Sequence, residues 1–160
     1  LEFRRVLFRS DTLERLLAAA DPVERPIMGA LCFGFKEIRP DGLNGYWSAP
    51  IPTVLDWATT ESGEQGFAPR FGYPPDEVVQ CTGTGSACLL IHRSVLEKLG
   101  PDPYTPLRNP TTGDLLGEDL SFCARAAQLD IPTHVHTGVR TSHLKPIWVG
   151  EDHYRMWPQS

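Results

Sequence analysis

The sequence has no long apolar run and no excess of positive charge. None of its apolar stretches approaches the roughly 20 residues that a helix needs to cross a bilayer. Its 15 Lys and Arg residues stand against 20 Asp and Glu residues, for a formal net charge of -5. The first absence argues against a membrane span, and the second argues against a nucleic-acid-binding surface. We therefore expect a soluble, cytoplasmic protein with no nucleic-acid partner.

Cysteine is scarce and unclustered. Cys32, Cys81, Cys88 and Cys123 are far apart, and no C-x-x-C pair occurs. This spacing argues against a disulfide framework and against a zinc knuckle, and it predicts reduced thiols in a core. With 160 residues, 41% hydrophobic and 22% charged, the chain has the size and composition of one folded domain. Wholesale disorder is excluded.

The first ten residues, Leu1 to Ser10, need separate treatment. They resemble the translation of a sequencing-adapter read, although a basic amphipathic arm is the alternative. We exclude residues 1–10 from fold reasoning as a probable artefact of sequencing and assign residues 11–160 to one partial domain. We expect that residues which preceded Asp11 in the parent protein are missing.

The first half of the chain predicts a helix, one strand and a long excursion. Asp11 is a candidate cap for a helix whose apolar residues recur at helical spacing. The apolar run 27–35 predicts a single buried strand. Residues 36–75 are rich in Gly, Pro and aromatic residues and predict mainly loop, with candidate strands at 46–48 and 54–58 and part of a binding cleft. The helical apolar residues are Leu13, Leu16, Leu17 and Ala20.

The second half predicts alternating short strands and helices. Strands are expected at 77–82 and 87–92, on either side of a glycine turn. A short helix follows at 93–100, with Ser94 as its cap and Gly100 as its stop. A second helix opens at 117–119, and strands follow at 133–136 and 139–144. The predicted class is α/β or mixed α+β. The core face of the second helix is Leu120, Cys123, Ala124 and Ala127.

The glycine turn contains Gly83, Thr84 and Gly85. It lacks the third glycine of a dinucleotide fingerprint and precedes a strand, so a Rossmann site is rejected. One interpretation is a tight turn between strands. The other is that the two glycines let backbone amides approach a bound sugar or phosphate closely.

Two acidic residues, Glu118 and Asp119, open the second helix. Acids in a first helical turn are commonly partners of the helix dipole. The preceding loop, 109–117, can instead place them at the rim of a cleft. A carboxylate within reach of a hydroxyl can act as a general base when its neighbour orients it.

The histidines give a weaker signal. His134 and His136 would point to one face of a strand, a spacing that metals use, but no third ligand stands at a recognised spacing. We therefore predict surface or loop histidines, and a His-based metal hydrolase is the weaker alternative. His143, at the end of a strand, is the histidine that we nominate as a ligand.

In their order along the chain, these motifs resemble the C-terminal half of family 2 glycosyltransferases. The matching segments are 83–96, 117–126 and 139–145, and residues 11–35 resemble the helix and strand that follow the Asp-x-Asp motif of such enzymes. The resemblance implies a GT-A-like mixed sheet with flanking helices, of which the chain holds the C-terminal half. No Asp-x-Asp stands before Asp11.

The resemblance also implies roles for single residues. The acidic motif falls on Glu118 and Asp119, with Asp119 as the base that deprotonates the acceptor. His143 would be the metal-associated histidine. Lys145 would meet the diphosphate, with a solvated lysine as the alternative, and Trp148 would stack on a sugar ring, with a core or interface tryptophan as the alternative.

The implied reaction is transfer of a sugar from a UDP- or GDP-sugar to a carbohydrate or other hydroxyl acceptor, inverting and metal-dependent. Mn²⁺ or Mg²⁺ would neutralise the diphosphate leaving group. The chain alone is expected to be inactive, because the residues that grip the nucleotide would precede Asp11. The alternative is a noncatalytic carbohydrate-binding or interaction module of the same architecture.

Overall fold

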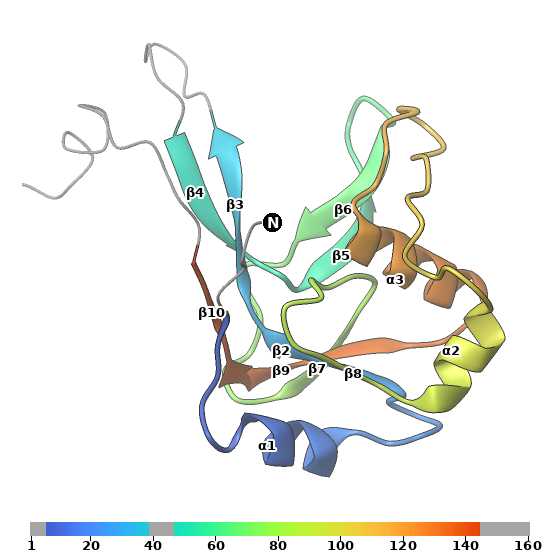
Figure 1. Ribbon diagram of the computed structural model, residues 1–160. Coiled ribbons are helices and arrows are strands. Elements are labelled where there is room, and N and C mark those ends of the chain that lie inside the picture. The colour runs from blue at the N-terminus through green and yellow to red at the C-terminus, as the bar shows by residue number, and fades with distance from the viewer. Residues whose placement is uncertain (1–5, 39–46, 145–160) are drawn as a thin grey trace, which may run out of the picture.

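A four-stranded mixed sheet lies at the centre of the molecule. The computed structural model describes residues 6–38 and 47–144. The strand order is β7 (Val78–Cys81), β9 (Thr133–Arg140), β2 (Ile27–Leu31) and β8 (Leu89–Ile91). β2 and β9 are parallel, whereas β7 and β8 run antiparallel to their neighbours. Helices lie on both sides of the sheet, which confirms the predicted mixed α/β class (Figure 1).

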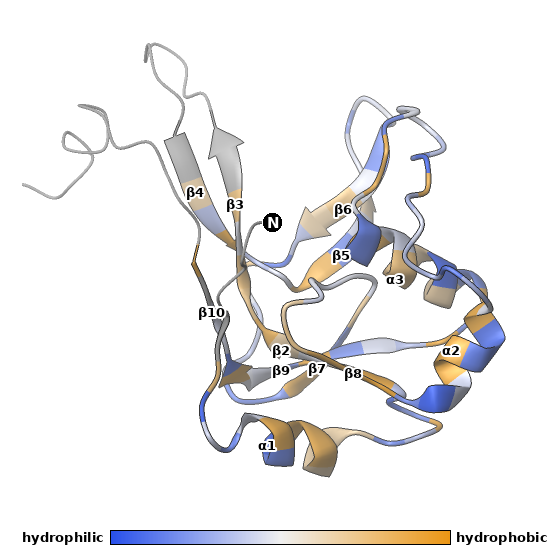
Figure 2. Ribbon diagram, viewed as in Figure 1, coloured by the Kyte–Doolittle hydropathy of each residue, from blue (hydrophilic) through white to orange (hydrophobic). Residues whose placement is uncertain are grey.

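The central strand β2 is apolar because both faces of the sheet are covered over it. All five residues of β2 are buried. Ile27 packs towards α3 (Glu118–Gln128), and Met28 packs towards α1 (Thr12–Ala19). Successive residues of a strand point to opposite faces, so a strand between two layers is apolar at every position. The apolar colour of β2 and β8 in Figure 2 reflects this arrangement.

The helix α1 forms where the sequence predicts it, but its apolar face is only partly buried. Leu16 is 1% exposed, whereas Leu13 is 61% and Leu17 is 56% exposed. Asp11 stands at the N-cap position, as predicted, but its side chain makes no capping hydrogen bond. It lies instead 3.5 Å from Nε of Arg9.

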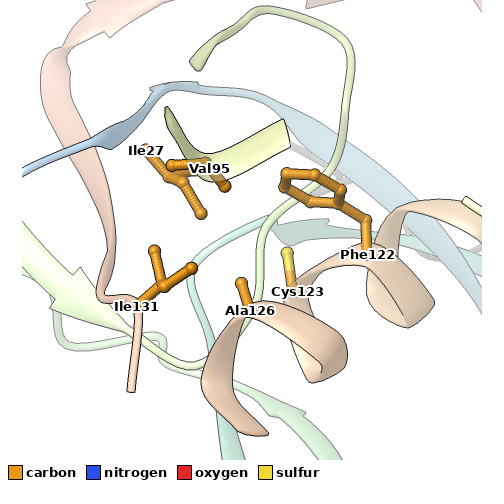
Figure 3. Close-up of a cluster of buried hydrophobic side chains, with 6 residues drawn as sticks. All are labelled: Ile27, Val95, Phe122, Cys123, Ala126 and Ile131. Atoms are coloured by element: carbon orange, nitrogen blue, oxygen red, sulfur yellow. The ribbon is translucent and has the colours of Figure 1, made fainter. Parts of the chain in front are cut away.

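The opposite face carries α2 (Arg93–Leu99) and α3, which enclose a cluster of buried side chains with β2 (Figure 3). The end of α2 is as predicted, since Gly100 adopts φ 75° at its C-cap. Its start differs, because His92 rather than Ser94 is the cap and its ring accepts the backbone N–H of Ser94. The cluster consists of Ile27, Val95, Phe122, Cys123, Ala126 and Ile131.

Two hairpins replace the predicted long strand and loop. The predicted strand 27–35 is wrong in extent, because β2 ends at Leu31 and β3 (Phe33–Ile38) pairs with β4 (Trp47–Pro52) outside the central sheet. The candidate strands at 46–48 and 54–58 overlap β4 and β5 (Leu55–Thr59), but the segment is not mainly loop, because β5 and β6 (Gln65–Pro69) form a second hairpin. Figure 1 shows the first hairpin extending away from the sheet and the second lying beside α3.

A small two-stranded sheet joins the first described residues to the last. β1 (Val6–Leu7) pairs antiparallel with β10 (Ser142–His143). Residues that we excluded from fold reasoning therefore contact the strand that carries His143. Strands are expected at 133–136 and 139–144. The structure has one strand, β9, that runs without interruption to Arg140, and the break before β10 falls at Thr141.

The cysteines and the helices agree with two further expectations. All four cysteines are free, and three of them are buried, as predicted for reduced thiols in a core. Among the described residues, no helix combines the length and apolarity needed to cross a bilayer.

Candidate functional site

Asp119 lies at the start of α3 with its two carboxylate oxygens in different surroundings. It is the second residue of the helix, after the N-cap Gly117 and the exposed Glu118. Its Oδ1 accepts the backbone N–H of Leu120 at 2.8 Å. Its Oδ2 faces the glycine segment, since a Cβ atom added at Gly85 would lie 3.6 Å from it. The helix thus fixes one oxygen and leaves the other turned towards Gly85.

The segment 83–85 is not a simple turn between β7 and β8. The backbone N–H and C=O of Gly83 both pair with Leu55 of β5. A Cβ at Gly83 would lie 2.7 Å from Cε1 of Phe67, so this glycine is required by the approach of an aromatic ring. Thr84 is fully buried, and its hydroxyl has no hydrogen-bond partner among the described residues. Gly85 is therefore the member of the segment that faces Asp119.

Two further residues complete the surroundings of Asp119. A Cβ at Gly85 would lie 3.4 Å from Cγ2 of Thr53, whose hydroxyl donates to the carbonyl of Cys32 at 3.0 Å. Burial raises the pKa of Tyr104; a side-chain hydrogen bond with Ser86 opposes this, and the negative charge of Asp119 adds to it. The Tyr104 ring also stacks on Phe122 of the core, with centroids 4.8 Å apart.

Sequence reasoning missed Thr53 and Tyr104. Each is a single residue in a segment without a recognisable motif, and each is brought to the site by tertiary structure alone. Only the Gly-rich and acidic motifs carried a local signal, because a helix start and a glycine pair have patterns that can be read from neighbouring residues.

The nearby thiols are not candidate nucleophiles. Cys123 lies one turn after Asp119, and its Sγ is 3.7 Å from the carbonyl oxygen of Thr84. Burial and, to a smaller extent, the charge of Asp119 raise the pKa of Cys123 to about 11. Burial likewise raises the pKa of Cys81 to about 12. Since the thiolate is the nucleophile, both cysteines remain unreactive near neutral pH.

The histidines of β9 are not surface or loop residues, so that prediction is wrong. His134 and His136 lie half-buried on a central strand of the sheet. Burial lowers the pKa of both rings, and the positive charges of Arg25 and Arg15 act in the same direction on His134 and His136 respectively. Nδ1 of His134 is buried without a hydrogen-bond partner in the described part of the chain.

The described side chains do not form the predicted metal site. Within residues 6–38 and 47–144, no three His, Cys, Asp or Glu side chains lie close enough to hold a metal ion. The backbone of His143 belongs to β10, but its side chain lies outside the described atoms, as do Lys145 and Trp148. The described donors alone do not fit a divalent metal, and we derive no step through one.

The chain matches no protein-family model, no curated protein and no solved structure. A functional proposal therefore depends on the sequence motifs and on the geometry around Asp119. That geometry brings together Asp119, Gly85, Gly117 and Thr53 from three separate segments of the chain, and Tyr104 is close enough for the charge of Asp119 to raise its pKa.

Proposed function

We propose that the chain is part of a GT-A-type glycosyltransferase of family 2, which transfers a sugar from a nucleotide-sugar donor to a hydroxyl acceptor. Two kinds of observation support the proposal. The ordered motifs at 83–96, 117–126 and 139–145 resemble that family, and the mixed sheet with helices on both faces is compatible with the GT-A architecture. The observation that carries it is the placement of Asp119 Oδ2 opposite Gly85.

Asp119 has the geometry of a positioned general base. Its Oδ1 is held by the N–H of Leu120, so the carboxylate has a fixed orientation while Oδ2 stays available. In the proposed step, Oδ2 takes the proton of the acceptor hydroxyl as that oxygen attacks the anomeric carbon. The bond between the anomeric carbon and the donor's phosphate oxygen breaks, and the nucleoside diphosphate leaves with the electron pair. A positioned base of this kind contributes about 10²- to 10⁴-fold to a rate.

Gly85 keeps the space before the carboxylate open. A side chain there would touch both Asp119 Oδ2 and Thr53, since an added Cβ lies 3.6 Å and 3.4 Å from them. Its φ is not in the left-handed region, so a larger residue is permitted by the backbone. The role that we assign to Gly85 is therefore steric: an acceptor hydroxyl occupies the place where a side chain would otherwise stand.

The experiment measures sugar transfer by the full gene product that contains this sequence, with UDP- and GDP-sugars. Asp119→Asn should lower turnover by roughly 10²-fold or more and leave donor affinity little changed, because only the proton acceptor is lost. Gly85→Val should lower turnover while the carboxylate stays in place. Asp114→Asn, at an exposed acid in the preceding loop, is the matched control and should have no effect.

The metal dependence stays a prediction, with His143 as its nominated ligand. A titration with Mn²⁺ tests it directly by calorimetry. His143→Ala should weaken donor binding when Mn²⁺ is present, and excess Mn²⁺ should recover part of it. Equal donor affinity with and without metal would contradict this part of the proposal and leave the role of Asp119 standing.

The second candidate is a noncatalytic carbohydrate-binding module of the same architecture. The hydrogen bond from Leu120 to Asp119 favours it, because an acid that stabilises a helix N-terminus needs no catalytic role. The Asp119→Asn variant separates the two candidates. Near-normal turnover of this variant would remove the base assignment, and an absence of transfer by the unsubstituted protein that still binds sugar would favour the binding module.

A further inference from the structure

A cavity of about 400 Å³ lies between α3, the β5–β6 hairpin and the segment 107–116. None of the residues that line it takes part in the proposed reaction. Trp57 and Phe67 of the hairpin and Ala124 and Ala127 of α3 all line it. The alanines of α3 have small side chains, and they leave space beside the two large rings of the hairpin.

The aromatic wall is held in position from several sides. The rings of Trp57 and Phe67 are perpendicular, with centroids 5.0 Å apart. The ring of Phe67 also lies against Gly83, where no side chain could fit without displacing it. Such contacts limit collapse of the hairpin onto α3, so the cavity is preformed.

A buried amide joins the hairpin to the segment that closes the cavity. Asn109 is only 7% exposed, and its Nδ2 donates to the carbonyl oxygen of Gln65 at 2.7 Å. Thr111 reinforces the connection, because its Oγ1 accepts the backbone N–H of Gln65 at 3.0 Å. The base of the hairpin is fixed by a two-bond ion pair between Arg70 and Asp56.

Three polar side chains stand among the apolar ones. Thr82, Arg108 and Gln128 all line the cavity. One guanidinium nitrogen of Arg108 donates to the carbonyl oxygen of Gly113 at 2.9 Å, which fixes the side chain. The hydroxyl of Thr82 and the amide of Gln128 make no hydrogen bond within the described part of the chain, so both are available to a ligand.

We propose that this cavity binds a hexopyranose ring. A pyranose has an apolar face of C–H groups, which suits an aromatic wall, and hydroxyls around its edge, which suit separate polar groups such as Thr82 and Gln128. An apolar ligand would make no hydrogen bond to these polar groups. A nucleoside diphosphate needs several positive charges, and among the described residues Arg108 is the single cation in the lining. The binding goes beyond the proposed transfer, because it requires neither donor nor base.

The test is an NMR titration of the ¹⁵N-labelled 160-residue chain with the methyl glycosides of glucose, galactose and mannose. At least one should shift the indole N–H peak of Trp57 and the amide peaks of α3 in a saturable way. Ala124→Leu fills the cavity and should weaken binding by about tenfold or more. Ala18→Leu makes the same change on the exposed side of α1 and should bind like the wild type.

Two results would overturn the proposal. They are no shift with any of the three glycosides and unchanged binding by a folded Ala124→Leu variant. A thermal melt shows whether each variant is folded, and Ala127→Leu is the second filling variant if the first is not. Failure of the transfer assay would leave this binding untouched, and failure of the titration would leave the role of Asp119 untouched.

Discussion

The helices α1 and α3 cover opposite faces of one sheet, but they do so to different extents. In α3, Phe122, Cys123 and Ala126 are all at most 1% exposed. In α1, only Leu16 among the apolar residues is buried, and Leu13 and Leu17 are more than half exposed. Both helices have amphipathic sequences, so amphipathicity alone does not tell whether an apolar face is fully covered.

The difference extends to the sheet beneath the helices. On the α3 side, Val79 and Val135 are buried beneath Val54. On the α1 side, the neighbouring strand β7 leaves Val78 and Gln80 exposed. The candidate active site stands on the well-packed side, where α3 can hold Asp119 in a fixed position. A rigid scaffold beneath a polar residue is what a positioned catalytic group requires.

The largest expected effect compares the best-buried side chain of each helix. Phe122→Ala should lower the free energy of unfolding by about 4 kcal/mol, because it removes a ring with 0% exposure from a packed cluster. Leu16→Ala should cost only about 2 kcal/mol, since Leu16 borders a cavity that also reaches exposed Leu13, and the site can rehydrate or collapse. Urea unfolding of both variants measures the difference.

Equal costs for the two substitutions would show that the α1 face is as tightly packed as the α3 face. If Phe122→Ala does not fold, Phe122→Leu provides the milder comparison. Both substitutions of Phe122 remove the ring on which Tyr104 stacks, so the fluorescence or absorbance of tyrosine offers a second readout.

The next comparison uses two glycines without room for a side chain, Gly138 on the α1 side of the sheet and Gly83 on the α3 side. A Cβ at Gly138 would lie 1.6 Å from Oδ1 of Asp76, and one at Gly83 would lie 2.7 Å from the ring of Phe67. The clash at Gly138 is the closer one, but we expect its relief to cost less stability. Asp76 is 71% exposed and can turn away, at the loss of its ion pair with Arg15. Surface ion pairs contribute about 0–1 kcal/mol.

We therefore expect Gly83→Ala to cost more than Gly138→Ala. Phe67 packs edge-to-face on Trp57, and a shift of its ring would disturb that contact, so overpacking there should cost about 1–3 kcal/mol. Gly72→Ala is the control, because nothing lies within 4 Å of its added Cβ. Denaturant unfolding of the three variants gives the order. A larger cost at Gly138 would mean that Asp76 and Arg15 are held more firmly than their exposure indicates.

The sequence predicts the positions of the helices and core strands better than it predicts how the strands pair. Period and length place α1, α3 and the core strands, because each has a local pattern of apolar residues. The run 27–35 was misassigned because nine apolar residues give no sign of leaving one sheet for another at Cys32. Of the two hairpins, the sequence predicts parts of three strands, at 33–35, 46–48 and 54–58, but not their pairing, because the Gly and Pro content of 36–75 obscures the short alternating segments.

The candidate site could be predicted only where its residues stand in local motifs. Asp119 and Gly85 belong to such motifs, and the structure places them together. Thr53 and Tyr104 reach the site through long-range packing, which no local pattern records. The half-burial of His134 was missed for the same reason, since a His-x-His alternation does not reveal which strand is central.

A smaller effect should appear in the pH dependence of the free energy of unfolding, through the two histidines on the α1 side of the sheet. Burial lowers the folded-state pKa of His134 and of His136 below the ordinary value of 6.5. Below pH 6.5 the unfolded chain therefore binds more protons than the folded chain. Their contribution to stability is complete above pH 6.5 and is lost as the pH falls through the interval down to the folded pKa.

Urea unfolding at a series of pH values between 7.5 and 5 checks this sign. His134→Gln should reduce the loss of stability below pH 6.5, because one of the two shifted groups is removed. The neighbouring charges of Arg15, Arg25 and Asp76 stay unchanged in the variant and provide a constant background. A variant whose stability falls with pH as steeply as that of the wild type would contradict the assignment to His134.

The smallest expected effect concerns the exposed row of α1. Leu13→Gln and Leu17→Gln should each change the free energy of unfolding by less than about 0.5 kcal/mol, because both side chains are more than half exposed. Glutamine keeps the helix propensity close to that of leucine, so the substitution mainly tests burial. Urea unfolding at two protein concentrations measures it. A cost above about 1 kcal/mol that grows with protein concentration would show that another molecule covers this face in solution, and the contrast between α1 and α3 would then belong to the isolated chain only.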